Sequence, residues 1–144
     1  MNVKIVSYKS VEYYQALALR DLVLRAPLGL IFSTQDLQSE DECIHFVVEL
    51  DDVIIATAQM VDLANSSFKM RQVAVHPNFQ GLGYGNEMVA FIENWAASNA
   101  VESIILHARE TACDFYLRRD YSILGEKFIE VGIPHYFMEK RISS

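Results

Sequence analysis

The segment from Val73 to Gly85, VAVHPNFQGLGYG, constrains the fold of this 144-residue chain more than any other. A β-like run ends near Val75, and three glycines within five residues lead into an amphipathic stretch of helical period. Glycine lets the backbone adopt φ > 0 and approach a ligand closely. The first N–H groups of a helix lack intrahelical partners, and the helix dipole is positive there. The segment therefore predicts a strand, an anion-binding loop and a helix, which together suit a phosphate or pyrophosphate.

Two other phosphate-binding motifs are excluded by the residues around this loop. A Walker A loop needs Lys-Ser or Lys-Thr after its last glycine, whereas Gly85 is followed by Asn86 and Glu87. A Rossmann fingerprint opens a βαβ unit with GxGxxG spacing, whereas these glycines are spaced GxGxG and follow a run of strands. A tight strand-to-helix connection that binds no ligand is the alternative interpretation of the loop.

Hydrophobic periodicity predicts an α+β fold with the order β-α-(α)-β-β-β-α-β-α-β-β. The expected elements are a strand over 3–8, a helix over 11–26 capped by Ser10, a loop over 28–42 with room for a short helix, strands over 43–50, 53–61 and 68–75, a helix over 84–99, a strand over 101–107, a helix over 111–119 capped by Thr111, and strands over 121–131 and 135–142 about a turn at 132–134. The three middle strands form an antiparallel meander. The first helix is expected to gather its apolar residues on one face, Val11, Tyr14, Leu17, Ala18 and Leu22.

Length and composition restrict the class of protein. A chain of this length is expected to form one domain over residues 1–144 and to bury about 70% of its unfolded surface. No apolar run approaches the roughly 18 to 20 residues of a membrane span, and the N-terminus does not resemble a signal peptide. Cys43 and Cys113 fit no metal-ligand spacing, so we expect no metal, no membrane partner and a cytoplasmic location. The net charge of −7 argues against a nucleic-acid partner and mildly favours a cationic partner such as an amine.

Two motifs in register resemble the signature of the GNAT superfamily of N-acetyltransferases. The family pattern Gln/Arg-x-x-Gly-x-Gly/Ala, after a strand ending Val-x-Pro, appears here as Val75-His76-Pro77 followed by Gln80, Gly83 and Gly85. Downstream, Ala112-Cys113-Asp114-Phe115-Tyr116 and then Arg119-Asp120-Tyr121 resemble the segment Ala-x-x-Phe-Tyr…Gly-Phe/Tyr. The predicted element order is also that of the family, so the resemblance covers essentially the whole chain. It implies an acetyl-CoA-dependent N-acetyltransferase with a mixed, mostly antiparallel central sheet flanked by helices.

The resemblance also implies where acetyl-CoA would bind. The strand before the loop would splay from its neighbour and pair with the pantetheine arm through the backbone at Val73, Ala74 and Val75. The pyrophosphate would accept hydrogen bonds from backbone N–H groups along a loop that starts at Gln80, namely those of Gly81, Leu82, Gly83, Tyr84 and Gly85. Arg109 stands where the family often has Asn, and it would contact substrate or a cofactor phosphate or be a solvated charge. Asp120 replaces a family glycine and tolerates left-handed backbone better than most residues.

Transfer to an amine calls for an acid and a base. By resemblance Tyr116 would protonate the leaving thiolate, with a plain core tyrosine as the alternative. His107 and His135 are candidate bases, because histidine titrates near neutral pH; Glu110 or Glu130 acting through water, or ordered water alone, are the other possibilities. The acceptor would be a primary amine of a small molecule or peptide, selected by the first helix, the loop over 28–42 and the last two strands, and a homodimer is common in the family. A non-catalytic acyl-CoA-binding sensor is the alternative function.

The acidic run Glu40-Asp41-Glu42 lies in the predicted loop. It would attract a polyamine or a basic peptide, or simply be a solvated loop.

Overall fold

A computed structural model of the chain describes residues 2–26 and 39–142. Its elements are β1 (Asn2–Val6), α1 (Val11–Arg20), η1 (Asp21–Arg25), η3 (Ser39–Glu42), β2 (Ile44–Leu50), β3 (Val53–Asp62), β4 (Ser67–Val75), η4 (Pro77–Phe79), α3 (Tyr84–Ser98), β5 (Ser103–Arg109), η5 (Glu110–Ala112), α4 (Cys113–Leu117), β6 (Ser122–Ile123), β7 (Phe128–Glu130) and β8 (Ile133–Arg141). The strands form one sheet in the order β1-β2-β3-β4-β5-β8-β6, with β7 paired to β8. Every pairing is antiparallel except that of β4 with β5. The α+β class, the mostly antiparallel sheet and the central meander are confirmed.

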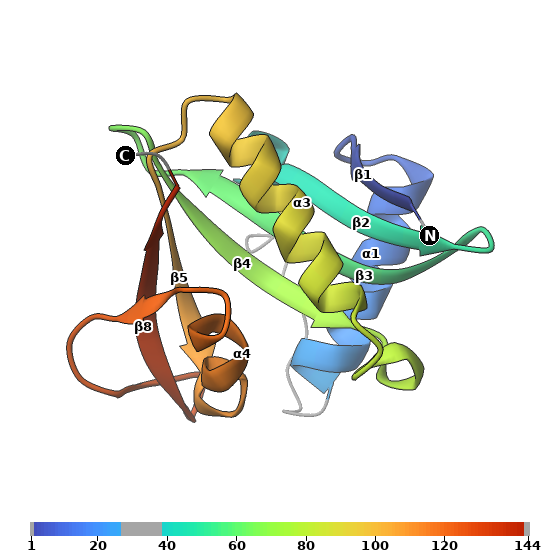
Figure 1. Cartoon of the computed structure of the whole chain (residues 1–144). Coiled ribbons are helices and arrows are strands. Elements are labelled where there is room, and N and C mark those ends of the chain that lie inside the picture. Colours follow the sequence, from blue (N-terminus) through green and yellow to red (C-terminus); the bar gives the residue numbers. More distant parts are fainter. Residues whose placement is uncertain (1, 27–38, 143–144) are drawn as a thin grey trace.

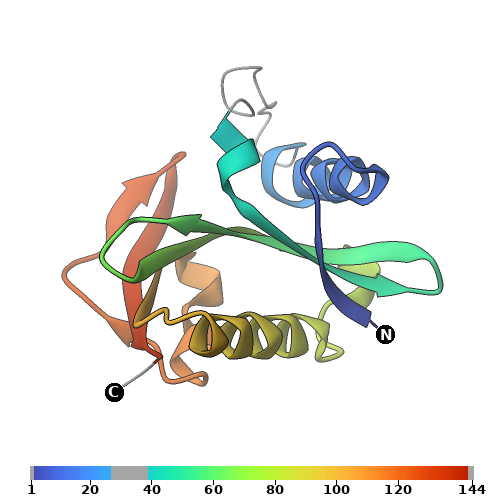
Figure 2. The same cartoon turned by 90° about the horizontal axis from the view of Figure 1, so that it is seen from above.

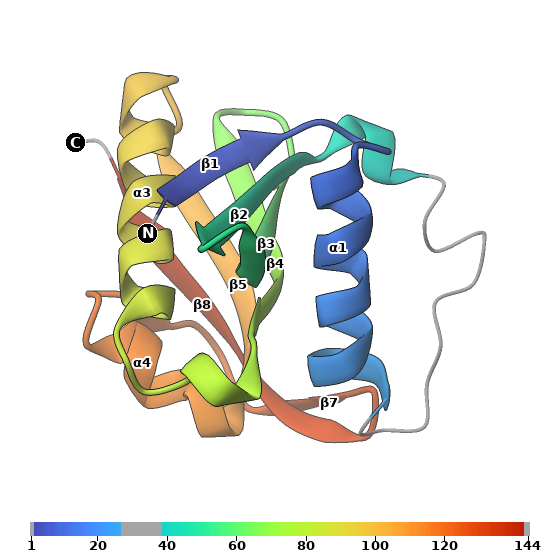
Figure 3. The ribbon, with the colours of Figure 1, turned by 90° about the vertical axis from the view of Figure 1, so that its right-hand side faces the viewer.

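Helices cover both faces of the sheet. Figures 2 and 3 show α1 on one face and α3 on the other. The larger core lies under α3, where Met88, Val89, Ile92 and Ala96 of the helix are buried against the sheet. A smaller core under α1 contains Val6, Ala16, Leu19, Val47 and Ile54.

The buried face of the first helix differs from the prediction. Val11 is 71% exposed and Tyr14 52%, whereas Tyr13, Ala16, Leu19 and Arg20 are buried. Arg20 takes a core position because Glu40 pairs with it there. Because a charged residue lies on the buried face, the apolar residues alone do not mark that face. The hydrophobic periodicity therefore predicted the wrong buried face of the helix.

Several boundaries also differ from the prediction. Ser10 caps α1 as expected, accepting a hydrogen bond from the Tyr13 N–H, but the predicted helix over 11–26 changes to π-type bonding in η1. Thr111 does not cap α4, because that helix starts after Ala112 and has no side-chain cap. The predicted strand over 121–131 splits into β6 and β7, with Gly125 at φ 79° between them, and the turn before β8 lies at 131–132.

The predicted loop over 28–42 lies largely outside the described residues, and its described end forms η3. No helix in the described part of the chain is long and apolar enough to cross a membrane. The single-domain organisation stays a prediction.

Candidate active site

The central feature of the sheet is the divergence of β4 from β5. The two strands pair in parallel only where 67–69 meets 103–105, at the start of each strand. Beyond that point they separate, as Figure 1 shows, and α4 follows the end of β5. A cavity of about 1100 Å³ lies along the separated parts of β4 and β5 and extends to the glycine loop, α4, β7 and η1. The splayed strand expected from the resemblance is therefore present.

A β-bulge in β4 accompanies this divergence. Thr57 pairs with Ala74 and Gln59 with Arg71, so Gln72 and Val73 together lie opposite the single residue Ala58. Gln72 adopts φ 55°, a left-handed conformation that a side chain other than glycine rarely takes. A bulge takes one residue out of the ladder and re-aims the strand, often beside an active site. Nothing in the sequence pattern pointed to this bulge.

The loop after β4 has the conformation that its glycines predicted. Gly81 has φ 77° and Gly83 φ 92°, and Gly83 occupies the N-cap position of α3. The Gln80 side chain donates through Nε2 to the carbonyl oxygen of Val75 over 2.9 Å, which ties the start of the loop to the end of the strand. A Cβ added to Gly85 would lie 3.4 Å from Cγ2 of Val75. The loop therefore turns tightly into a 15-residue helix whose first N–H groups have no intrahelical partner.

Most of the predicted acetyl-CoA contacts surround this one cavity. Those that line it are Val73, Ala74, Val75, Gln80, Gly81, Gly83, Gly85 and Arg109. The side chains of Leu82 and Tyr84 do not: Leu82 is 65% exposed, and the Tyr84 ring packs edge-on against Phe79 at 6.0 Å. Leu82 and Tyr84 could therefore contact acetyl-CoA only through their backbone groups.

Tyr116 lines the cavity from α4 and is only 6% exposed. Its ring packs edge-on against Phe115 at 5.0 Å and Tyr121 at 5.5 Å. Burial raises the pKa of the Tyr116 phenol above its ordinary value, so the hydroxyl stays protonated at neutral pH. Among the described residues its hydroxyl has no hydrogen-bond partner, which leaves the proton available to a ligand in the cavity. Asp120, three residues after α4, adopts φ 71°, as its place in the motif predicted.

Both predicted histidines lie beside one carboxylate, Glu130 of β7. Nδ1 of His107 lies 3.0 Å from Oε1 of Glu130, and Nε2 of His135 lies 3.7 Å from Oε2. Burial opposes the charge on Glu130, but the hydrogen bond with His107 and the charges of His107, His135 and Lys69 outweigh it and lower the pKa of the Glu130 carboxyl. All three groups line the cavity. Glu110 does not line it and pairs with Lys127 at 2.9 Å instead.

The two histidines differ in their surroundings. The side chain of His135 is 4% exposed, and its Nδ1 lies 2.8 Å from the carbonyl oxygen of Ile133. The side chain of His107 is 24% exposed, and its ring packs against Phe128 and Phe137. An Nδ1–H of His107 donating to Glu130 would leave Nε2 with a free lone pair, so His107 is the better placed to accept a proton from a ligand.

The described lining of the cavity is cationic, although the chain as a whole is acidic. It contains Lys69, Arg71, Arg109, Arg118 and Arg119 and one carboxylate, that of Glu130. Arg119 is held by Glu93 at 2.6 Å and by Asn86 at 2.6 Å. Arg109 donates to the carbonyl oxygen of Leu24 over 3.2 Å, which links β5 to η1. Lys69 and Arg71 flank Met70 in β4, a spacing that puts both side chains on one face of the strand.

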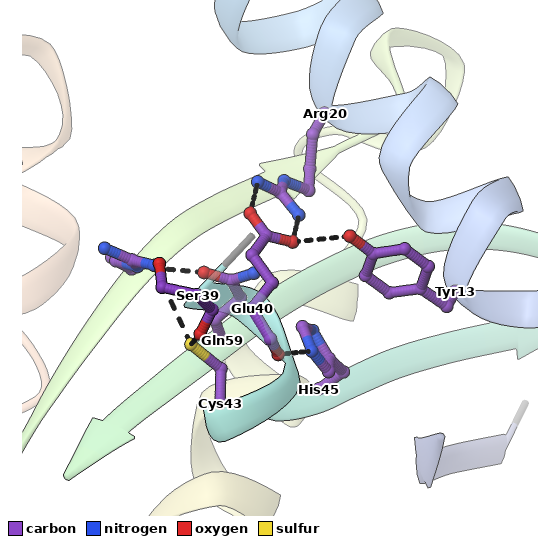
Figure 4. Close-up of polar contacts among 8 residues, drawn as sticks. Tyr13, Arg20, Ser39, Glu40, Cys43, His45 and Gln59 are labelled. Carbon is purple, nitrogen blue, oxygen red and sulfur yellow. Dashed lines mark hydrogen bonds and ion pairs between the residues drawn. The ribbon is translucent and has the colours of Figure 1, made fainter. Parts of the chain in front are cut away.

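A buried polar cluster lies between α1 and the sheet (Figure 4). Arg20 donates two hydrogen bonds to the Glu40 carboxylate, at 2.8 and 2.6 Å, and the Tyr13 hydroxyl donates a third at 2.8 Å. Nε2 of His45 lies 2.8 Å from the Glu40 carbonyl oxygen. Both side chains of the ion pair are 2% exposed. Glu40 is thus bound inside the protein, so the acidic run around it does not offer this charge to a cationic ligand.

Comparison with known proteins agrees with this architecture. The profile of the acetyltransferase (GNAT) family matches residues 11–121. The uncharacterized protein YyaT of Bacillus subtilis (strain 168) is 26% identical over 104 residues, which cover 72% of this chain and 70% of YyaT. A crystal structure from Lactobacillus plantarum has a TM-score of 0.87 at 24% identity, covering 99% of this chain and 100% of that one. An aminoglycoside 6'-N-acetyltransferase complexed with coenzyme A has a TM-score of 0.82 at 14% identity, covering 100% of this chain and 98% of that one. At these identities the structural likenesses show the fold alone.

Proposed function

The chain belongs to the acetyltransferase (GNAT) family, and on this premise we propose that it transfers an acetyl group from acetyl-CoA directly to a primary amine in a ternary complex. The observation that carries the proposal is one cavity that joins the glycine loop, the Tyr116 hydroxyl and the His107–Glu130 pair. An acyl transfer needs these three functions next to one another: a site for the donor, an acid for the leaving thiolate and a base for the amine.

The end of the cavity at the glycine loop suits the phosphates of coenzyme A. The left-handed Gly81 and Gly83 expose backbone, and the free N–H groups of the first turn of α3 favour an anion. Arg118 and Arg119 line the same cavity. The backbone of 73–75, on the separated part of β4, would pair with the amide groups of the pantetheine arm.

The reacting groups would meet beside the bulge in β4. His107, oriented by Glu130, would take a proton from the ammonium group of the acceptor, and the free amine would attack the thioester carbonyl. As the C–S bond breaks, Tyr116 would give its proton to the departing thiolate, and the second proton lost by the nitrogen would restore the phenol. Backbone N–H groups released by the bulge would stabilise the oxyanion, since donors aimed at developing charge lower the barrier most. Each of these roles uses a group that lines the cavity.

Turnover separates this proposal from a non-catalytic acyl-CoA-binding sensor. The purified protein is incubated with acetyl-CoA and a panel of primary amines, and release of the free thiol is followed with time. A CoA concentration of 100 times its dissociation constant would stabilise the fold by about 2.7 kcal/mol, so thermal shift reports binding independently of turnover. Acceptor-dependent thiol release supports the enzyme, whereas a CoA-induced shift with no turnover on any amine supports the sensor.

A further inference from the structure

Two cations of β4 lie on the side of the bulge away from the glycine loop. Lys69 and Arg71 are separated by the buried Met70, so their side chains lie on the same face of the strand, and both line the cavity. Val23 and Leu24 of η1 line it as well. The cavity that holds the two cations is therefore also bordered by the first helical segment, where acceptor selection is expected.

Neither cation has a carboxylate partner within 4 Å among the described residues. Arg71 donates through Nε to the Gln59 side-chain oxygen over 2.9 Å and lies 3.7 Å from Sγ of Cys43, which leaves other guanidinium N–H groups unused. Nζ of Lys69 lies 3.5 Å from Nδ1 of His107. Burial lowers the pKa of the Lys69 ammonium, partly offset by the charge of Glu130, so a nearby anion would stabilise its charged form.

The phosphates of coenzyme A do not account for these charges. The phosphate site proposed above begins at Gln80, beyond the end of β4, and a strand advances by about 3.3 Å per residue. Arg71 therefore lies roughly 13 Å before Val75 along β4. With the pantetheine arm paired to 73–75, as proposed above, the two cations would lie beyond the thioester, on the side of the acceptor.

We infer that the acceptor is an amine that also carries a carboxylate, of the amino-acid class, and that Lys69 and Arg71 bind this carboxylate. The inference rests on the proposed function. Glu130 is the only carboxylate of the described lining and lies beside His107, so it favours the ammonium end of such a molecule. The cations on β4 favour its carboxylate, and because Nζ of Lys69 also lies 3.5 Å from Nδ1 of His107, the two charged groups of the acceptor must be close together, as in an amino acid. The same two cations would repel a polyamine or an aminoglycoside.

Matched acceptors provide the test. Initial rates of thiol release are measured for several L-amino acids and for their carboxamides, which keep the amine but lose the negative charge. The wild type should prefer the acids by at least about 10-fold in kcat/KM, as expected for charge-assisted hydrogen bonds. Arg71→Gln and Lys69→Gln should each reduce this preference, mainly through KM for the acid. Lys127→Gln, an exposed lysine outside the lining, is the matched control and should leave the preference unchanged.

The outcomes separate this inference from the proposed function. Equal or greater activity on carboxamides or polyamines would overturn the carboxylate site and leave the acetyltransferase intact. If both variants keep the preference for the acids, Lys69 and Arg71 do not bind the carboxylate of the acceptor. Turnover on none of the amines would instead contradict the proposed function. Thermal shift with CoA, run on each variant, confirms that the variant is folded.

Discussion

Nδ1 of His107 lies 3.0 Å from Oε1 of Glu130, which joins the end of β5 to the short strand β7. Both strands pair with β8, and β7 pairs with its first residues, so the sheet itself brings the carboxylate to the histidine. A carboxylate that accepts from one ring nitrogen fixes the tautomer and makes the other nitrogen a stronger base. The pair thus turns a strand-end histidine into a candidate general base.

His107→Gln is expected to lower kcat/KM by roughly 100-fold, the lower range for loss of a general base. Glu130→Gln should have a smaller effect, about 10-fold, because the histidine remains but loses its orienting carboxylate. The measurement is kcat/KM against pH between 6 and 9. The wild-type rate should fall on the acid side, as expected for a reaction that uses a general base, and His107→Gln should lose this dependence.

Glu126→Gln, which changes an exposed carboxylate near β7, is the control for a general charge effect. If kcat/KM of His107→Gln still falls on the acid side as in the wild type, the general base is His135 or water. His135→Asn then separates those two.

Tyr116→Phe is expected to lower kcat by roughly 100-fold while CoA affinity stays within about 2-fold, because only the donated proton is lost. The matched control is Tyr121→Phe. The two rings lie 5.5 Å apart, but only Tyr116 lines the cavity. Single-turnover kinetics with acetyl-CoA and titration with CoA measure the two effects separately. Equal losses in both variants would mean that the hydroxyl of Tyr116 serves packing in this region and not proton transfer.

Local sequence patterns predicted the parts of the site that depend on local chemistry. The glycines needed left-handed backbone, and Gly81 and Gly83 have it. Asp120 was expected to replace a glycine in such a conformation, and its φ is 71°. Each of these expectations concerns a single turn, where the identity of one residue decides the conformation.

Local sequence patterns could not predict contacts between residues that are far apart in the chain. The face of α1 was assigned wrongly because Arg20 is buried by Glu40, 20 residues away. The bulge at Gln72 depends on the register of β3 against β4, which no single-strand pattern records. Two histidines distant in the chain share Glu130 only because β5 and β7 both pair with β8.

Three glycine-to-alanine substitutions distinguish two roles of glycine: close approach of the backbone to the ligand and relief of backbone strain at positive φ. In Gly85→Ala the new Cβ would lie 3.4 Å from Val75, an ordinary contact, and alanine favours a helix over glycine by up to about 1 kcal/mol. We expect its stability to be kept while CoA affinity falls by roughly 10-fold, since the methyl group covers backbone at the anion site.

The other two substitutions, Gly83→Ala and Gly125→Ala, both act at positive φ, 92° and 79°. Each should lose about 1 to 2 kcal/mol of stability, but only Gly83→Ala should also weaken CoA binding. Urea unfolding and calorimetric titration with CoA supply the two readouts. Normal CoA affinity in both Gly85→Ala and Gly83→Ala would show that the phosphates bind elsewhere.

The Arg20–Glu40 pair predicts that stability is lost toward acid pH. Burial disfavours charge on Glu40, but the hydrogen bonds and charge of Arg20, with those of Tyr13 and His45, outweigh it and lower the pKa of the carboxyl. Burial also lowers the pKa of His45, an effect that outweighs its hydrogen bond to Glu40. Groups with lowered pKa in the folded state bind more protons when the chain unfolds. The free energy of unfolding should therefore fall as pH drops below 6.5, the ordinary value for His45, and more steeply below 4.5, the ordinary value for Glu40.

Glu40→Gln tests this prediction, because it removes the charge and keeps the shape. It leaves the guanidinium of Arg20 buried without its carboxylate, a change that costs roughly 3 to 5 kcal/mol at neutral pH. The variant should also lose the steep step below pH 4.5. Urea unfolding at pH 4, 5.5 and 7.5 measures both effects, with Glu126→Gln as an exposed control. A variant as stable as the wild type at pH 7.5, with the same acid slope, would mean that the buried pair contributes nothing net to the fold.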